Sequence, residues 1–374
     1  MLNQELVFGA LARHGVDFFT GVPDSYLNGF CNYALQHYPQ RNIIAANEGN
    51  AIAIASGHYI ATRQVPLVYM QNSGLGNAIN PLASLVERRV YAIPMVLLIG
   101  WRGQPGTGDW PQHEQQGEIT LPLLDVLNIP YTVLEDDDAK IEQVVSHAVE
   151  TSRTTRRPYA LVAPKGVMAG SKGNDTDDRF PMSREEAIET ALNAMPSDTI
   201  YSATTGRATR ELFFLRERRG ESKACDFLNV GSMGHASSVA LGIALARPER
   251  NVVCLDGDSA AILHLGAMTM VSKLQAPNFL HIVLNNGAHE SVGGQPSAGL
   301  LVDFIKIAEG CGYHTCGAPA TTAEELVAAI EDFKRAKRAT LIDAHIHKGL
   351  RGKLPPLDFS HREAIDALID ELNR

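Results

Sequence analysis

Short apolar runs of strand length alternate with longer segments of helical periodicity along almost the whole chain, and the alternation occurs in two separate series. The first series contains the runs DFFTGVP, RNIIAA, VPLVYM, PMVLLIG and YALVA, and the second contains TIYSAT, NVVCLD, FLHIVLN and ATLIDAHI. Strands that alternate with helices in this way form mostly parallel sheets. The sequence therefore predicts an α/β protein with two doubly wound, mostly parallel sheets.

A polar segment separates the two series. Residues 164–181 read PKGVMAGSKGNDTDDRFP, which is rich in Gly, Asp and Lys and shows no periodicity. Immediately after it, Ser183 and Glu186 have the spacing of a helix capping box. We expect a first domain over residues 1–165, a linker over 166–182 and a second domain over 183–374. The length of 374 residues suits two such domains better than one.

Composition and charge exclude several classes of protein. The chain has no run of eighteen consecutive apolar residues, and its N-terminal segment lacks a basic region and a cleavage site, so we expect a cytoplasmic protein. The five cysteines lack paired CxxC spacing, which argues against disulfides and a structural zinc site. A formal net charge of −9 provides no basic field for nucleic acid or an anionic membrane, so neither is expected as a partner.

Two polar turns follow apolar runs of the second series. NVVCLD leads into Gly257-Asp258-Ser259, and FLHIVLN leads into Asn286-Gly287. Because ligands of doubly wound sheets bind beyond the carboxyl ends of the strands, Asp258 and Asn286 are expected to face the same region. A carboxylate and an amide oxygen suit Mg²⁺ bound to a diphosphate, and the glycines allow close backbone approach. Taken singly, each of these residues equally suits a helix cap or a turn.

The sequence GDS, followed after 25 residues by NN, resembles the signature of thiamine-diphosphate-dependent enzymes, in which GDG precedes NN by about two dozen residues. Ser259 stands where that signature has its third glycine. The resemblance implies thiamine diphosphate and Mg²⁺ as cofactors, with the metal held by Asp258, Asn286 and Ala288.

The resemblance also implies a catalytic glutamate in the first domain. Glu48 precedes the small-residue helical segment AIAIASGHYIATR, as that glutamate does in the family. It is expected to exchange a proton with N1′ of the cofactor's aminopyrimidine ring. The alternative is an ordinary acidic residue in the first turn of a helix, where the helix dipole favours negative charge.

Further cofactor contacts follow from the same resemblance. Met233, between Gly231 and Gly234, corresponds to the apolar residue that bends the cofactor, although a methionine also suits a core. The segment ATTGRATREL is expected to contact the diphosphate or simply to cap a helix. The expected cofactor-binding residues are Glu48, Thr204, Thr205, Gly206, Gly231, Met233, Gly257, Asp258, Ser259, Asn286 and Gly287.

Within the thiamine-diphosphate enzymes, FFTGVPDSYLNGF and LNNGAHESVGGQPS resemble the two-domain phosphonopyruvate decarboxylases, with sulfopyruvate decarboxylases as the close alternative. This implies decarboxylation of phosphonopyruvate to phosphonoacetaldehyde and carbon dioxide through a thiamine-diphosphate ylide, a step of phosphonate biosynthesis. Catalytic candidates beside Glu48 are Asp24 and His113, which equally suit an N-cap and a surface loop. Candidates for substrate binding are Asp24, Ser25, Gln116 and His289, and cations for its anionic group are sought among His289, Arg102, Lys348, Arg351 and Lys353.

Two functions of other kinds remain as alternatives. A nicotinamide dehydrogenase is disfavoured because NSGLGNAIN has Ile79 where the third glycine of the dinucleotide fingerprint is required. A non-catalytic thiamine-diphosphate-binding scaffold is disfavoured because Glu48, Asp258 and Asn286 are present. The resemblance implies a homo-oligomer with its sites at the subunit interface. A phosphonate and a sulfonate are tetrahedral anions of similar size, so physical reasoning does not choose between these substrates.

Overall fold

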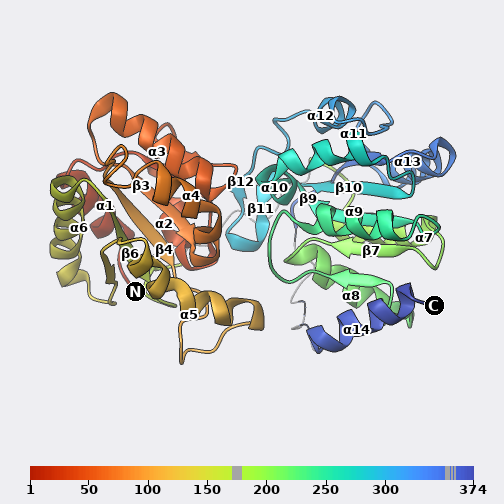
Figure 1. The fold of residues 1–374 in the computed structure, drawn as a ribbon, viewed down its shortest axis with the longest axis horizontal. Coiled ribbons are helices and arrows are strands. Elements are labelled where there is room, and N and C mark those ends of the chain that lie inside the picture. Colours follow the sequence, from red (N-terminus) through yellow and green to blue (C-terminus); the bar gives the residue numbers. More distant parts are fainter. Residues whose placement is uncertain (171–178, 350–353, 355–356, 358) are drawn as a thin grey trace. The chain divides into compact units, whose positions relative to one another are not determined.

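The structure, a computed structural model, describes residues 1–170, 179–349, 354, 357 and 359–374 (Figure 1). The chain forms two compact units. Unit 1 contains Met1–Asn174 and Val292–Gln295, and unit 2 contains Asp175–Ser291 and Pro296–Arg374. The linker expected over 166–182 lies partly outside the described residues.

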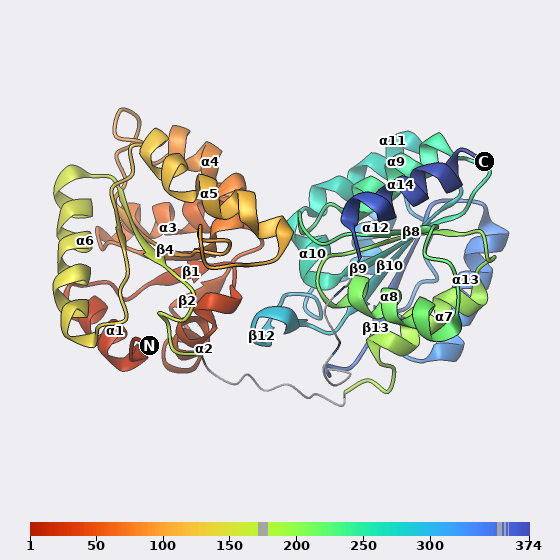
Figure 2. The ribbon, with the colours of Figure 1, turned by 90° about the horizontal axis from the view of Figure 1, so that it is seen from below.

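Unit 1 is a parallel six-stranded sheet with the strand order β2-β1-β3-β4-β6-β5. Helices α1, α2 and α6 pack on one face of this sheet, and α3, α4 and α5 pack on the other (Figure 2). The strands are β1 (Phe19–Gly21), β2 (Asn42–Ile44), β3 (Leu67–Gln71), β4 (Met95–Gly100), β5 (Tyr131–Val133) and β6 (Pro158–Ala163). The helices are α1 (Gln4–Arg13), α2 (Asn28–His37), α3 (Glu48–Thr62), α4 (Leu75–Ser84), α5 (Pro111–Val126) and α6 (Ile141–Thr155).

Unit 2 is a parallel five-stranded sheet with the order β13-β10-β9-β7-β8, again covered by helices on both faces. Its strands are β7 (Ile200–Ala203), β8 (Asp226–Leu228), β9 (Val252–Gly257), β10 (Phe279–Asn285) and β13 (Thr340–His345). One face carries α7 (Arg184–Ala194), α8 (Arg207–Arg219) and α13 (Ala323–Ala336). The other carries α9 (Ala236–Ala246), α10 (Asp258–Leu263), α11 (Met270–Leu274), α12 (Phe304–Gly310) and α14 (His361–Leu372). The short strands β11 (Ala288–His289) and β12 (Gln295–Pro296) pair with each other.

The predicted fold class is confirmed, because both sheets are parallel and doubly wound. Each apolar run named above contributes a strand, and the capping box of Ser183 and Glu186 is present at the start of α7. Two strands of the main sheets, β5 and β8, were not predicted, and neither was the short pair β11 and β12. Both β5 and β8 have three residues and lie at a sheet edge, and β5 is only half-buried, so their sequences carry a weak apolar signal.

Each sheet has a point where the chain reverses its direction of strand addition. In unit 1, β2 is added on one side of β1 and β3 on the other, and in unit 2 the same holds for β8 and β9 on either side of β7. The reversal lies between β1 and β3 in unit 1 and between β7 and β9 in unit 2. The loops that follow these neighbouring strands lead to opposite faces of the sheet, and doubly wound proteins bind ligands between such loops.

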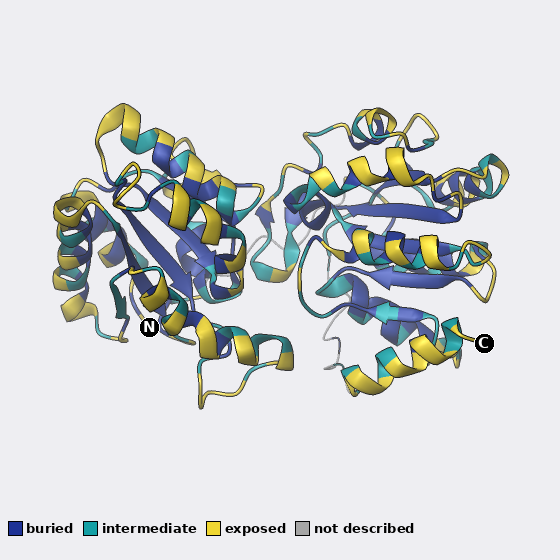
Figure 3. Ribbon diagram, viewed as in Figure 1, coloured by how far each residue is buried: buried dark blue, intermediate teal, exposed yellow. Residues whose placement is uncertain are grey.

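Burial follows the layered arrangement of each unit. The central strands of both sheets are buried, whereas the helices expose their outer sides (Figure 3). Within the described parts of the chain, no helix has the length and apolar character needed to cross a lipid bilayer.

Candidate active site

Glu48 is a buried carboxylate at the start of α3. Asn47 caps this helix by accepting a hydrogen bond from the backbone NH of Asn50 at 2.9 Å, which places Glu48 in the first turn. The residue is 6 % exposed, and burial raises the pKa of its carboxyl group even though Asn77 Nδ2 donates to Oε2 at 2.8 Å. A carboxyl group that holds its proton more tightly than usual is suited to proton exchange with a ring nitrogen.

The place of Glu48 is fixed by a glycine. A Cβ atom at Gly74 would lie 2.3 Å from Glu48 Oε1, so any side chain at that position would displace the carboxylate. Gly76, two residues further on in α4, has open space around its Cα. The close approach at Gly74 is therefore specific to the residue that faces Glu48.

Asp24 joins the carboxyl ends of β1 and β3. It follows β1, is fully buried, and accepts hydrogen bonds from Gln71 Nε2 at 2.6 Å and from the backbone NH of Tyr26 at 3.1 Å. Burial raises its pKa. Asp24 is also the N-cap of the short 3₁₀ helix Ser25–Leu27, so the structural alternative and the catalytic one fit the same geometry.

Arg102, sought as a cation for the substrate, is held by Asp109. Its Nε and Nη2 atoms donate to the two carboxylate oxygens of Asp109 at 2.7 and 2.6 Å, and Nη1 donates to Ser25 Oγ at 3.1 Å. Burial opposes ionisation of Asp109, but the hydrogen bonds from Arg102 and from the backbone of Trp110 hold its pKa far below the usual range. The charge of Arg102 is therefore already compensated.

His113 and Gln116 lie in the first turns of α5. The Trp101 indole donates to the carbonyl oxygen of Gly117 at 2.9 Å, which ties this helix to the residue that follows β4. Burial, together with the nearby charge of Arg102, lowers the pKa of His113 to about 4. The imidazole is thus neutral near pH 7, where it can accept a proton or donate a hydrogen bond.

Asp258 is a buried carboxylate in unit 2 that has no cationic partner among the described residues. It is the first residue of α10 and is 3 % exposed. Ser297 Oγ donates to Oδ2, and a Cβ atom at Gly299 would lie 2.2 Å from the same oxygen. Burial raises the pKa of Asp258 to about 7. A buried carboxylate without a counter-charge fits a bound divalent cation.

The two adjacent asparagines after β10 have different tasks. Asn285 Nδ2 donates to the carbonyl oxygen of Gly299 at 2.9 Å and to Asp343 Oδ1 at 3.1 Å, so Asn285 holds the surrounding chain together. Asn286 Oδ1 accepts from the backbone NH of Ala288 at 3.0 Å, and its Nδ2 donates to Glu290 Oε2 at 2.9 Å. These two bonds fix which way the Asn286 amide faces.

Glu290 is itself anchored on two sides. Arg184, at the start of α7, pairs with the same carboxylate and also with Glu211 Oε1 at 3.2 Å. The other oxygen of Glu290 accepts from the backbone NH of Gly349 at 2.9 Å. The orientation of Asn286 therefore depends on an ion pair between residues far apart in the sequence.

Donors without a partner gather after β7 and β9. Thr204 Oγ1 and Ser259 Oγ are buried and find no hydrogen-bond partner within the described residues. Thr204 lies beside the β9 terminus, because a Cβ atom at Gly257 would be 3.9 Å from Thr204 Cγ2. Gly206 has φ 97°, and the half-buried Thr205 precedes it. Unpartnered hydroxyls next to the start of a helix fit the diphosphate group of the expected cofactor.

Met233 lies in a tight turn before α9. Ser232 adopts φ 50°, and the backbone NH of Gly231 donates to Asn229 Oδ1 at 3.1 Å. Met233 is only half-buried and belongs to neither core cluster of unit 2. This placement argues against the alternative that it simply fills the core.

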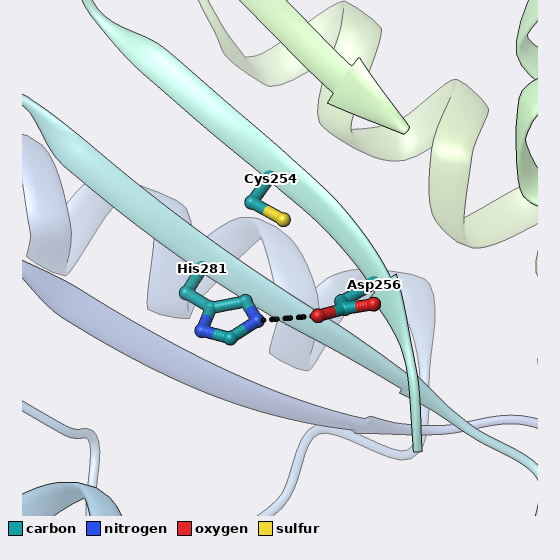
Figure 4. Close-up of side chains that lie close together, drawn as sticks. All are labelled: Cys254, Asp256 and His281. Carbon is teal, nitrogen blue, oxygen red and sulfur yellow. Dashed lines mark hydrogen bonds and ion pairs between the residues drawn. The ribbon is translucent and has the colours of Figure 1, made fainter. Parts of the chain in front are cut away.

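A buried polar cluster supports the strand that precedes Asp258. Cys254, Asp256 and His281 lie on the neighbouring strands β9 and β10, with their potential ligand atoms within 4.8 Å of one another (Figure 4). His281 Nε2 contacts Asp256 Oδ2 at 3.3 Å, and Asp256 Oδ1 accepts from the backbone NH of Gly257 at 3.0 Å. Both oxygens of Asp256 are engaged, so we interpret the cluster as support for the Gly257–Ser259 turn.

The remaining candidates are less closely tied to these groups. His289 lies in β11, and burial lowers its pKa to about 4. Lys348 follows β13, and Arg351 and Lys353 lie outside the described residues.

Sequence reasoning did not find Gln71, Asn77, Asp109, Arg184, Glu290 and Ser297, whose roles depend on contacts between distant segments. A signal was available for Asp256, which is a charged residue inside an otherwise apolar strand.

Comparisons with known proteins decide the family. Residues 1–125 match the family model described as the N-terminal TPP binding domain of thiamine pyrophosphate enzymes, and residues 205–344 match the C-terminal one. The chain is 33 % identical to phosphonopyruvate decarboxylase of Streptomyces viridochromogenes, covering 96 % of this chain and 93 % of that one. The chain belongs to the phosphonopyruvate decarboxylase family. The predicted cofactor, thiamine diphosphate, and the predicted enzyme class, a thiamine-diphosphate-dependent decarboxylase, are thereby confirmed at the level of the family.

Two further relatives agree with this placement. Phosphonopyruvate decarboxylase of Streptomyces hygroscopicus is 31 % identical, covering 97 % of this chain and 93 % of its own. Sulfopyruvate decarboxylase of Methanosarcina acetivorans, the predicted alternative, is 27 % identical over 96 % of this chain and 95 % of its own. The phosphonopyruvate decarboxylases are therefore the nearer of these relatives.

Proposed function

We propose that this protein decarboxylates 3-phosphonopyruvate to phosphonoacetaldehyde and carbon dioxide, with thiamine diphosphate and Mg²⁺ as cofactors. The observation that carries the proposal is the similarity to phosphonopyruvate decarboxylase over 96 % of the chain at 33 % identity. The buried carboxylates of Glu48 and Asp258 support it, because the chemistry needs one for proton exchange and the other for the metal.

Thiamine diphosphate, when bound, supplies an electron sink for the carbanion formed as carbon dioxide leaves. Asp258, Asn286 and Ala288 would hold the metal. Thr204, Thr205, Gly206, Gly257 and Ser259 would bind the diphosphate, Gly287 would allow its close approach, and Gly231 and Met233 would contact the rest of the cofactor.

The chain's own proton chemistry rests on three residues of unit 1. Glu48, whose pKa is raised by burial, would exchange a proton with N1′ of the aminopyrimidine ring. Asp24, also buried, and the neutral His113 are the groups that move protons at the substrate. Ser25, Gln116 and His289 would contact the substrate.

Sulfopyruvate decarboxylation is the second candidate, supported by the similarity to sulfopyruvate decarboxylase at 27 % identity. Release of aldehyde and carbon dioxide should be measured from phosphonopyruvate, sulfopyruvate and pyruvate in parallel, with each cofactor present or omitted. Preferred turnover of phosphonopyruvate that needs both cofactors supports the proposal. Preference for another 2-oxo acid overturns the substrate, and no turnover of any overturns the enzymatic function.

The place and assembly of the enzyme complete the proposal. All five cysteines are free, as is usual in a reducing compartment, so we place the protein in the cytoplasm. We further propose a homo-oligomer in which unit 1 of one subunit and unit 2 of its partner share each cofactor.

A further inference from the structure

Arg207 is a half-buried cation that has no hydrogen-bond or ion-pair partner in the described part of the chain. It is the first residue of α8 and directly follows Gly206 at the end of the loop after β7. Among the residues that the structure describes, its guanidinium group forms no hydrogen bond and no ion pair. Burial lowers its pKa, and the carboxylates of Glu290 and Glu211 offset this effect only in part.

The carboxylates near Arg207 already form ion pairs with another arginine. Arg184 pairs with both Glu211 and Glu290, and Arg210 donates to the carbonyl oxygen of Leu354. Both neighbouring carboxylates are thus bound by Arg184. Neither of them forms an ion pair with Arg207 in the described part of the chain.

The position of Arg207 at a helix start makes its positive charge more costly. The start of a helix carries partial positive charge from its free NH groups, and α8 is 13 residues long. A guanidinium group there is repelled by the helix dipole and has also lost part of its hydration. An anion bound next to Arg207 would be attracted by the guanidinium group and by the helix NH groups, and this attraction would offset both costs.

Two buried hydroxyl groups give an independent sign of a ligand at this place. Thr204 and Ser259 are 6 % and 9 % exposed, and their Oγ1 and Oγ atoms lack partners within the described residues. They follow β7 and β9, the strands between which the order of unit 2 reverses. Hydroxyl donors, helix NH groups and a guanidinium group together suit the oxygens of a phosphate-type anion.

We propose that Arg207 binds a phosphate-type anion at the carboxyl ends of β7 and β9. The inference rests on the proposed function, which supplies two such anions, the diphosphate of the cofactor and the phosphonate of the substrate. Arg207 is a cation that neither the sequence motifs nor the resemblance assigned.

The test compares Arg207→Gln with Arg210→Gln, which removes the same charge from the same helix one turn later. Binding of thiamine diphosphate and of inorganic pyrophosphate, each with saturating Mg²⁺, is measured by calorimetry. Turnover of phosphonopyruvate and of pyruvate is measured on the same preparations, and circular dichroism checks that each variant is folded. Pyrophosphate binding needs no catalysis, so this arm remains informative if the wild type fails to turn over any 2-oxo acid.

A contact with the diphosphate predicts that Arg207→Gln weakens binding of both probes ~10-fold or more. A contact with the phosphonate predicts unchanged probe binding and a fall of ~10-fold or more in kcat/KM for phosphonopyruvate, with pyruvate unaffected. Either result supports the proposal, and Arg207→Lys should recover part of the loss. Changes below ~2-fold in all assays, or equal effects of Arg210→Gln, overturn it.

Discussion

Asn286 donates its amide hydrogen to Glu290 at 2.9 Å, while its amide oxygen accepts from the backbone NH of Ala288 at 3.0 Å. Since only one end of an amide can donate, the bond to Glu290 determines that the oxygen faces the opposite side. This is the atom that a hard cation requires. Glu290 is therefore a positioning residue for the expected metal ligand.

The first prediction concerns Glu290→Ala. Without its acceptor the Asn286 amide is free to rotate, and Mg²⁺ affinity in the presence of thiamine diphosphate should fall about 10- to 100-fold. The measurement is a Mg²⁺ titration of cofactor binding followed by calorimetry, which does not depend on turnover.

Glu211→Ala is the matched control for this prediction. It removes the other carboxylate that pairs with Arg184 but leaves the hydrogen bond between Glu290 and Asn286 in place. Metal affinity should therefore change far less in this variant. Equal losses of metal affinity in the two variants would show that Glu290 acts only through the general stability of the ion-pair cluster.

The second prediction concerns Gly74→Ala. The added Cβ atom would lie 2.3 Å from Glu48 Oε1, so the carboxylate must move and decarboxylation should fall ~10²-fold or more. Gly76→Ala is the control, because nothing lies within 4 Å of a Cβ atom there. That variant should keep its activity, with a small gain in helix stability. Steady-state kinetics of both variants, compared with Glu48→Gln, provide the test, and a fully active Gly74→Ala enzyme would exclude the assigned role of Glu48.

A site residue could be predicted from the sequence where its immediate neighbours in the chain form a recognisable pattern. Asp258 and Glu48 stand beside strand ends and small residues, and the capping box of Ser183 and Glu186 needs only a spacing of three. The pairing of Arg184 with Glu290 joins positions 106 residues apart, and no local pattern selects one arginine over another. The strands β5 and β8 were missed for a different reason. An edge strand of three residues has too few buried positions to show a hydrophobic period.

The third prediction concerns pH and Asp24. Burial raises the pKa of this carboxyl group above its ordinary value of 3.8, so folding disfavours the ionised form. The stability linked to this group is fully present at pH values below the pKa of Asp24 in the unfolded chain. It is lost as the pH rises through the pKa of Asp24 in the folded protein. Asp24→Asn, which cannot ionise, should therefore gain stability relative to the wild type as the pH rises from ~4 to ~8.

Urea denaturation followed by tryptophan fluorescence suits this measurement, because both tryptophans, Trp101 and Trp110, lie in unit 1 together with Asp24. The free energy of unfolding of the cofactor-free protein should be measured for both forms across the pH range. A difference between them that does not vary with pH would contradict the prediction. Loss of decarboxylase activity in the same variant would separate the catalytic role of Asp24 from its role as a helix cap.

The fourth prediction tests whether two subunits share each site. Glu48 lies in unit 1 and Asp258 in unit 2, and Glu48→Gln and Asp258→Ala should each abolish turnover. If every cofactor is held by unit 1 of one subunit and unit 2 of its partner, a mixed oligomer contains one site with both native carboxylates and one with neither. Random mixing of equal amounts, after unfolding and joint refolding, should then restore about a quarter of the wild-type activity.

If each site instead belonged to a single chain, every site in the mixture would lack one carboxylate and activity would stay at the level of the separate variants. Two affinity tags, one on each variant, establish that mixed oligomers have formed, so an inactive mixture would count against shared sites and not against mixing.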